Sequence, residues 1–166
     1  MRVKNYQRYI LYSVFSLTIL LRFVHKYDWP IWGSDSGEYL YLTKYLVKNG
    51  MILNEGYIGW GRAYPDFQGM QILTATIALV FGVSYYTSLT WFIPLISGLA
   101  IPMLFIIGKE LVGFIPALFG SAFYGVTFGV VYANSHPLPG GLAETLGFVL
   151  ILNWLKIMKD DTIWVI

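Results

Sequence analysis

Two carboxylates lie three residues apart, directly after the first apolar segment of the chain. They are Asp35 and Glu38, in the segment Trp32-Gly33-Ser34-Asp35-Ser36-Gly37-Glu38-Tyr39. This spacing places both side chains on one face of a helix. Carboxylate oxygens suit Mg²⁺ or Mn²⁺, which in turn bridge a phosphate, and Asp35 is also a candidate general base toward an acceptor hydroxyl. The pair is predicted to be catalytic, with Asp35 as a candidate metal ligand.

The same spacing also has a purely structural interpretation. Asp35-x-x-Glu38 is a capping-box pattern, in which Asp35 is the N-cap and Glu38 folds back onto the helix start. Spacing alone favours neither capping nor catalysis. Glu38 can serve both roles, whereas the two roles compete for the oxygens of Asp35.

Three other polar residues are candidates for binding the substrate. Arg62 lies in the segment Gly59–Asp66, and a guanidinium at the mouth of a membrane cavity suits a lipid-linked phosphate. The alternative is an interfacial arginine that contacts ordinary headgroups. His136 and Glu144 lie in Asn134–Glu144 and are candidates to contact the donor, with Glu144 as a second metal ligand. Their alternatives are an interfacial histidine and a first-turn acid favoured by the helix dipole.

Composition places these residues in a membrane protein. Of the 166 residues, 57% are hydrophobic and only 12% are charged, whereas a soluble domain carries roughly 25% charged residues. The 13 Tyr and 6 Trp residues suit membrane interfaces. The sequence has no Cys, which excludes disulfides, thiolate nucleophiles and Cys-based metal sites. A net charge of +2 is too small to indicate nucleic-acid binding.

The apolar stretches predict an all-α polytopic membrane protein, with residues 1–166 as a single transmembrane module. Transmembrane helices are expected over residues 9–24, 89–107, 115–132 and 142–158, with the start of a further one over 162–166. Arg22-Phe23-Val24-His25 lacks the small residues of a signal-peptide cleavage site, so the first helix is expected to remain. Because the last residues begin a new apolar run, the chain is predicted to be a fragment of a longer protein.

The external loop is expected over residues 25–88, with a surface-lying helix over 35–48 and a re-entrant helix over 65–83. In the first of these helices, Tyr39, Leu42 and Leu46 form an apolar stripe, and the pair Asn49-Gly50 suits its end. Lys44 and Lys48 point elsewhere.

The second of these helices, which Gly82 is expected to end, decides the predicted topology. Ile72–Val83 is about a dozen residues long, which is short against the roughly 20 needed to span. If this helix enters the membrane part-way and returns to the same side, Lys109, Lys156 and Lys159 lie on the cytoplasmic side with the N-terminal cations, as the positive-inside rule favours. A helix at this depth must be covered by protein or line a cavity. The N-terminus is therefore expected to be cytoplasmic and the first loop external, in a multi-pass protein of the cell membrane.

The order of these features resembles the N-terminal part of the GT-C fold glycosyltransferases. That superfamily includes oligosaccharyltransferase catalytic subunits, protein O-mannosyltransferases and aminoarabinose transferases. The matching segments are Gly33–Leu40, Lys48-Asn49-Gly50, Tyr64–Gly69, Phe81–Ser84 and Asn134–Glu144. These motifs are short, and their arrangement over nearly all of the chain carries the resemblance. The resemblance implies that Asp35 serves the acceptor or a bound metal, and it matches Glu144 to the acid of a second external loop.

The chain departs from that pattern in two respects. His136-Pro137-Leu138-Pro139 stands where several relatives have an arginine followed by an Asp-rich run. The relatives are also several times longer, with further transmembrane helices and often an external C-terminal domain. A missing C-terminal portion or a partner subunit is therefore an expected partner, beside membrane lipids and a lipid-linked sugar donor.

The resemblance implies an enzyme that moves a sugar from a polyprenyl-phosphate-linked donor to an acceptor on the external face. A metal or Arg62 would stabilise the charge that develops on the leaving phosphate. An inactive piece of such an enzyme fits the same features. The alternative is a small polytopic transporter or a non-catalytic accessory subunit, because charges inside membranes usually mark transport pathways. The apolar stretches that begin at Leu89 and Ile115 carry no charge in their cores, which weakens the transport interpretation.

Overall fold

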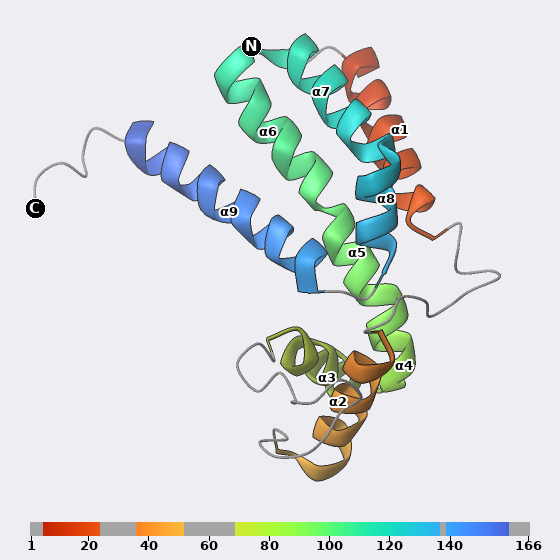
Figure 1. Cartoon of the computed structure of the whole chain (residues 1–166). Coiled ribbons are helices and arrows are strands. Elements are labelled where there is room, and N and C mark those ends of the chain that lie inside the picture. Colours follow the sequence, from red (N-terminus) through yellow and green to blue (C-terminus); the bar gives the residue numbers. More distant parts are fainter. Residues whose placement is uncertain (1–4, 24–35, 52–68, 137–138, 160–166) are drawn as a thin grey trace, which may run out of the picture.

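The computed structural model is an all-helical bundle with a smaller layer of helices at one end (Figure 1). It describes residues 5–23, 36–51, 69–136 and 139–159. Its elements are α1 (Asn5–Leu21), α2 (Ser36–Asn49), α3 (Gly69–Phe81), α4 (Tyr85–Thr87), the π-helical turn η3 (Ser88–Phe92), α5 (Ile93–Gly98), α6 (Ala100–Val112), α7 (Phe114–Val126), α8 (Phe128–Ser135) and α9 (Pro139–Lys159). The predicted all-α class is confirmed in these ranges.

A rod of 28 residues, Tyr85–Val112, is made of α4, η3, α5 and α6. By length and composition, this rod and Pro139–Met158 of α9 are each long and apolar enough to cross a membrane. This rod extends beyond the predicted bounds of 89–107 at both ends. The Ser84 side chain accepts a hydrogen bond of 3.0 Å from the amide of Thr87 and so starts the helix within a polar stretch. Gly113 ends it with a φ of 91°, a conformation that favours glycine.

Prolines explain the irregularities inside this rod. Pro94 lies in the first turn of α5, where its missing N–H group is tolerated. Pro102 cannot donate to the carbonyl of Gly98, four residues earlier, and the helix breaks between them at Leu99. The break leaves backbone carbonyls of α5 within reach of other partners.

The predicted helix over 115–132 was wrong, because the chain forms two helices there, α7 and α8. Thr127 separates them with an extended backbone of ψ 127°, and its hydroxyl donates to the carbonyl of Phe123 at 2.8 Å. Threonine makes such local bonds in competition with helical ones.

Other predicted bounds shift by a few residues. The helix predicted over 9–24 is α1 and ends at Leu21, and the helix predicted over 142–158 is α9 and begins at Pro139. Lys109 and Lys156, which were expected on the inside, lie within α6 and α9. The predicted ends followed apolar content alone, which does not fix where a helix begins or ends.

The α2 and α3 helices confirm the predicted glycine stops. Gly50 has a φ of 66° and donates its amide to the carbonyl of Leu46 at 2.9 Å. Gly82 has a φ of 65°, and the amide of Val83 bonds to the carbonyl of Ala78 at 3.1 Å, which is a Schellman-type ending. In α2, the predicted apolar stripe is buried or half-buried, and both lysines are exposed. The start predicted for the second helix, residues 65–68, lies outside the described residues.

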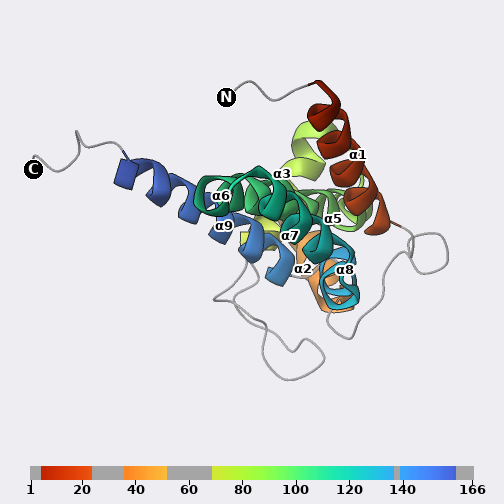
Figure 2. The same ribbon diagram turned by 90° about the horizontal axis from the view of Figure 1, so that it is seen from above.

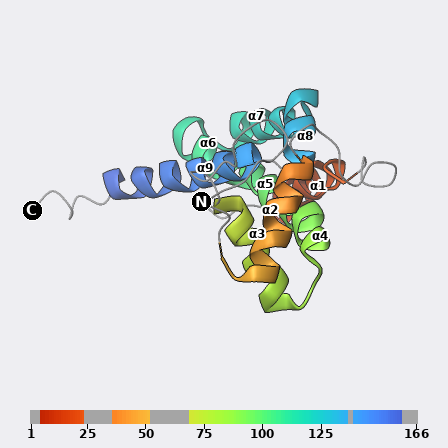
Figure 3. The same ribbon diagram turned by 60° about the horizontal axis from the view of Figure 1, so that its bottom comes forward.

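The small layer consists of α2, α3 and α4, and Figure 3 shows α2 between the other two. Its buried side chains meet the bundle in what we call the junction cluster, formed by Met70, Leu89, Ile93 and Leu142, with Tyr39, Leu40, Leu73 and Ile96 packed against it. The hydroxyl of Ser88 adds a buried hydrogen bond of 2.8 Å to the carbonyl of Thr74. Four segments far apart in sequence therefore fix the layer to the end of the bundle.

Within the bundle, α6 packs against α7 and α9, and α1 packs against α7. Figure 2 shows the far part of α9 leaving the other helices and extending outward. The start of α1, the α6–α7 turn and the far end of α9 lie toward one end of the molecule (Figure 1). The small layer and the α8–α9 turn lie toward the other end, which we call the layer end.

Gly125 permits the close contact between α1 and α7. A Cβ atom added there would lie 2.6 Å from Cγ2 of Thr18 and 3.1 Å from Cδ1 of Ile101. In the same helix, a Cβ at Gly120 would meet no described atom within 4 Å.

We expect Gly125→Ala to lower the free energy of unfolding by about 1–3 kcal/mol, because neighbouring helices must shift apart. Gly120→Ala is the matched control and should leave it unchanged or raise it by up to about 1 kcal/mol, since alanine favours helix. Denaturant unfolding in detergent micelles, followed by circular dichroism, measures both. Equal effects of the two substitutions would contradict the packing described here.

Candidate functional site

His136 lies in the turn between α8 and α9 and is buried, with 1% of its surface exposed. Its Nδ1 is in hydrogen-bond contact with the carbonyl of Tyr132, and the two rings lie 4.4 Å apart. The alternative of an interfacial histidine concerns its depth in the membrane and stays a prediction. His136 is therefore packed inside the protein, in the turn that lies toward the layer end.

Glu144 lies in the second turn of α9, because this helix begins at Pro139. The alternative of a first-turn acid stabilised by the helix dipole was therefore wrong, since that effect fades beyond the first turn. The Glu144 side chain is half-buried and interacts electrostatically with Arg22. A carboxylate of α9 and a cation that follows α1 are thus near enough to interact through their charges.

Arg22 is a site residue that the sequence reasoning missed. It is the first residue after α1, and its exposed fraction is 0%. Its Nη1 donates a hydrogen bond to the carbonyl of Thr18. Its Nε and Nη2 are buried and have no hydrogen-bond partner in the structure as described. Burying a guanidinium is costly, and the charge of Glu144 offsets part of that cost.

Gly98, at the end of α5, leaves room for the Arg22 side chain. A Cβ atom there would lie 3.4 Å from Cδ and 3.7 Å from Nε of Arg22, and 3.2 Å from Cγ1 of Ile19. On its other flank, the last turn of α1 contacts α7 at Gly125. Phe23 then stacks on Trp91 of η3, with 5.3 Å between ring centroids. The end of α1 is thus held on three sides.

Thr145 holds the neighbouring part of α9 in place. Its hydroxyl lies 3.2 Å from the carbonyl oxygen of Ile96 and 3.4 Å from that of Ser97, beside the break that ends α5. It also lies 3.1 Å from the carbonyl oxygen of Gly141 in its own helix. The hydroxyl therefore links α9 to α5 and keeps the adjacent Glu144 near Arg22.

Two other buried polar groups were missed. The hydroxyl of Tyr124 in α7 has no hydrogen-bond partner within the described ranges, and its ring packs edge-on against Phe148, one turn beyond Glu144. Gln71 in α3 has an exposed fraction of 0%, and neither of its amide atoms has a partner in the described part of the chain. An unpaired buried amide costs about 1–3 kcal/mol. The described residues therefore contain several buried polar atoms without a hydrogen-bond partner, although the composition is mostly apolar.

The structure brings some of the predicted site residues to one end of the molecule and leaves others undescribed. His136 lies in the α8–α9 turn, Glu144 in the second turn of α9 and Glu38 in the first turn of α2. The α8–α9 turn and α2 both lie toward the layer end (Figure 1). Asp35 and Arg62 lie outside the described residues. The shared face of Asp35 and Glu38, its capping alternative and the role of Arg62 therefore stay predictions.

A metal site that joins Glu144 to Asp35 stays a prediction, because Asp35 lies outside the described residues. No three His, Cys, Asp or Glu side chains gather as a metal site in the ranges that the structure describes. The positive charge of Arg22 also repels a cation from Glu144.

The sequence did contain signals for the missed residues. Arg22 is a lone cation directly after an apolar segment, at the end where the positive-inside rule places few cations. Gln71 occupies a core position in an otherwise apolar helix. In both cases the decisive property is burial, which depends on distant segments.

Comparison with protein-family models, curated proteins and solved structures found no match to this chain. Its function is therefore inferred from its residues and their geometry.

The Arg22–Glu144 interaction predicts a coupled effect on stability. We expect Glu144→Gln to lower the free energy of unfolding by about 2–4 kcal/mol, because it leaves a buried guanidinium uncompensated. Arg22→Gln should cost less, since Glu144 is half-exposed. The double variant should cost at least about 1 kcal/mol less than the sum of the single changes.

Denaturant unfolding in detergent micelles measures this cycle, with Arg8→Gln as the control. Arg8 is exposed at the opposite end of α1, and its replacement should change little. Strictly additive effects of the two site substitutions would show that the charges do not interact.

Proposed function

We propose that this chain is a membrane-embedded module of a glycosyltransferase whose donor is a sugar linked to a polyprenyl phosphate. The observation that carries the proposal is the buried Arg22, paired by charge with Glu144 at the layer end of an apolar bundle. A polyprenyl-phosphate donor has an apolar tail and one anionic group at the membrane boundary. An arginine directly after an apolar helix suits that group.

The distribution of charge supports an external site. The start of α1, the end of α6 and the far end of α9 lie toward the end of the molecule opposite the small layer (Figure 1), and these segments contain Arg8, Lys109 and Lys156. Under the positive-inside rule, that end faces the cytoplasm. In this proposal, the layer end faces outside, where Glu38, His136 and Glu144 are found, and the chain is a multi-pass protein of the cell membrane.

In the proposed reaction, residues of the first external loop and residues around the α8–α9 turn have different roles. An acceptor oxygen or nitrogen attacks the anomeric carbon of the sugar, and the bond from that carbon to the phosphate oxygen breaks. The phosphate leaves with the bonding electron pair. Asp35 takes the proton of the acceptor, with Glu38 beside it, and Arg22 stabilises the negative charge of the leaving phosphate. His136 and Glu144 shape the opposite side of the donor site.

A transporter or accessory subunit is the second candidate. A pair of opposite charges inside a helical bundle is also typical of transport pathways, and the Arg22–Glu144 pair is such a feature. The two candidates differ in one product. Only the enzyme releases a polyprenyl phosphate from the donor.

We expect Asp35→Ala to reduce sugar transfer by about 10²-fold or more, because a positioned general base contributes that much. The full chain in lipid nanodiscs is supplied with a panel of radiolabelled polyprenyl-phosphate sugars, and released polyprenyl phosphate is measured. Asp28→Ala, in the same predicted loop, is the matched control and should retain transfer. The circular dichroism spectrum shows whether each variant folds.

Transfer that survives in Asp35→Ala would remove this residue from the mechanism. If the wild-type chain releases no polyprenyl phosphate from any donor of the panel, the enzyme proposal fails and the transporter is favoured.

A further inference from the structure

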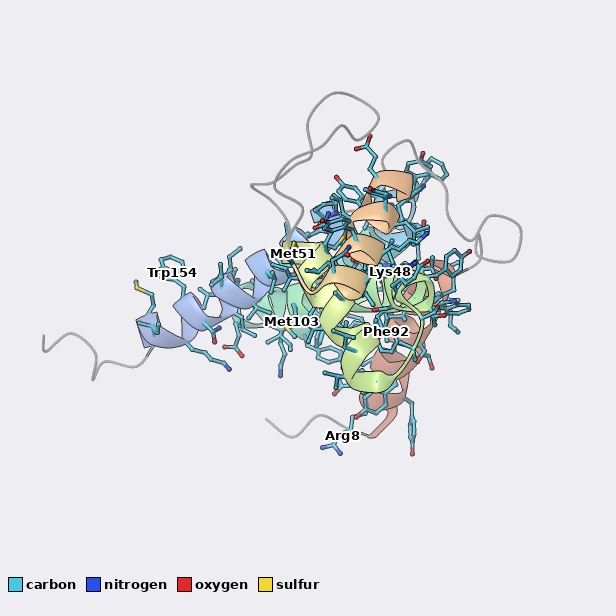
Figure 4. All side chains as sticks on the ribbon, turned by 90° about the horizontal axis from the view of Figure 1, so that it is seen from below. Arg8, Lys48, Met51, Phe92, Met103 and Trp154 are labelled. Carbon is cyan, nitrogen blue, oxygen red and sulfur yellow. The ribbon has the colours of Figure 1, made fainter. Side chains whose placement is uncertain are left out.

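The protein covers α9 less than it covers the other helix that is long enough to cross a membrane. In Pro139–Met158, 17% of the apolar window is buried, against 44% in the rod Tyr85–Val112. Figure 4 shows the part of α9 that carries Trp154 projecting away from the other helices, and Figure 2 shows the same from the opposite side. Trp154 itself is 58% exposed. Much of α9 is therefore open to a neighbour in the membrane.

The exposed residues of α9 include a regularly spaced row. Leu142 and Thr145 face the bundle, in the junction cluster and against the carbonyls of α5. On another side of the helix, five exposed residues follow one another in steps of three, four, three and four. We call them the α9 seam: Ala143, Leu146, Leu150, Asn153 and Ile157. This is the spacing of the core positions in helices that wrap around each other as left-handed pairs. The α9 seam thus has the pattern of a helix–helix contact.

Asn153 distinguishes the α9 seam from an ordinary lipid-facing surface. Its exposed side chain lies between Leu150 and Ile157 of the seam, about 21 Å along the helix from Pro139 at 1.5 Å per residue. In a helix that spans a hydrocarbon core about 30 Å thick, this position lies inside the core. An amide there is costly unless it is hydrogen-bonded, and the short Asn side chain cannot extend to the membrane surface as the nearby Lys156 can. Asn153 therefore requires a polar partner at its own depth.

A second copy of the chain supplies such a partner. A carboxamide group both donates and accepts hydrogen bonds, so two Asn side chains satisfy each other. Copies of a membrane protein share one orientation, and a two-fold axis along the membrane normal brings the same residue of each copy to the same depth. In paired helices, a single Asn at a core position fixes the register and the number of strands. The Asn153 side chain is thus complementary to itself, which favours an identical partner over an unrelated helix.

We propose that two copies of this chain pair in the membrane along the α9 seam, with the Asn153 amides hydrogen-bonded to each other across the two-fold axis. The leucine and isoleucine side chains of the seam pack on either side of this bond. The small layers of the two copies then lie on the same side of the membrane. This inference concerns the assembly of the chain and does not depend on the reaction that the chain catalyses.

Cysteine cross-linking tests which face of α9 meets the second copy, because the chain has no Cys of its own. Leu146→Cys, Leu150→Cys and Ile151→Cys are introduced one at a time into the full chain in liposomes, and copper phenanthroline with oxygen oxidises the thiols. A disulfide forms only between Cβ atoms that come close together. We expect the first two variants to form cross-linked dimers at several times the rate of Ile151→Cys. Ile151 is the matched control, because it is exposed on α9 but lies outside the α9 seam.

Variants of Asn153 test the hydrogen bond itself. Donor-labelled and acceptor-labelled chains are mixed in liposomes, and the energy transfer between them is followed as lipid is added. Asn153→Ala should weaken the association about 3- to 30-fold, the range that polar contacts between membrane helices contribute. Asn153→Gln keeps the amide and should weaken it less. Ile151→Ala is the control and should leave the association unchanged. Because all of these side chains are exposed, the variants should fold, and circular dichroism checks that they do.

Three results would overturn the proposal. The first is a wild-type chain without energy transfer in dilute liposomes, which would mean that a different helix or lipid covers the α9 seam. The second is equal cross-linking of Leu150→Cys and Ile151→Cys, because the copies would then meet without a defined face. The third is an association that Asn153→Ala leaves unchanged, since the choice of an identical partner rests on this amide.

Discussion

A guanidinium withdrawn from water requires an opposite charge nearby, and much of this bundle is arranged around that requirement. Arg22 is completely buried, and Glu144 is the carboxylate whose charge reaches it. Gly98 gives its stem room, and the Thr145 hydroxyl fixes the segment of α9 that carries Glu144. The break in the helical rod at Leu99 leaves the carbonyls that Thr145 contacts near this hydroxyl. Packing, helix irregularity and charge therefore converge on one point at the layer end.

This arrangement connects the fold with a chemistry. In an apolar bundle, a buried polar group that lacks some of its hydrogen bonds lowers the stability of the fold. Such groups are found mainly at functional sites. Arg22 keeps two donors of one edge without a hydrogen-bond partner across the described residues. The hydroxyl of Tyr124 in α7 and the amide of Gln71 in α3 are further buried polar groups without a partner in the described ranges. A ligand with an apolar tail and a small anionic group would relieve the charge at Arg22, and this is the property that links the buried pair to a lipid-linked donor.

Local signals were predictable from the sequence, and long-range burial was not. Gly50 and Gly82 end their helices as expected, because a glycine with positive φ acts through its own backbone. One continuous helix was predicted over 115–132, but Thr127 divides it into α7 and α8. Apolar content alone does not reveal a break inside an apolar stretch. Arg22 was missed as a site residue because its neighbours, Gly98 of α5 and the charge of Glu144 in α9, lie far along the chain. Asp35 and Arg62, which carried most of the predicted chemistry, lie outside the described residues.

The most direct test of this account is the nuclear magnetic resonance signal of the Arg22 side-chain Nε–H group. The full chain is labelled with ¹⁵N-arginine in nanodiscs, and the signal is assigned by its loss in Arg22→Lys. The account predicts that the methyl diester of polyprenyl phosphate shifts this signal, while the Nε–H signal of Arg8 stays in place. An Arg22 signal that does not move at saturating diester would contradict the central claim that this buried guanidinium binds the lipid phosphate.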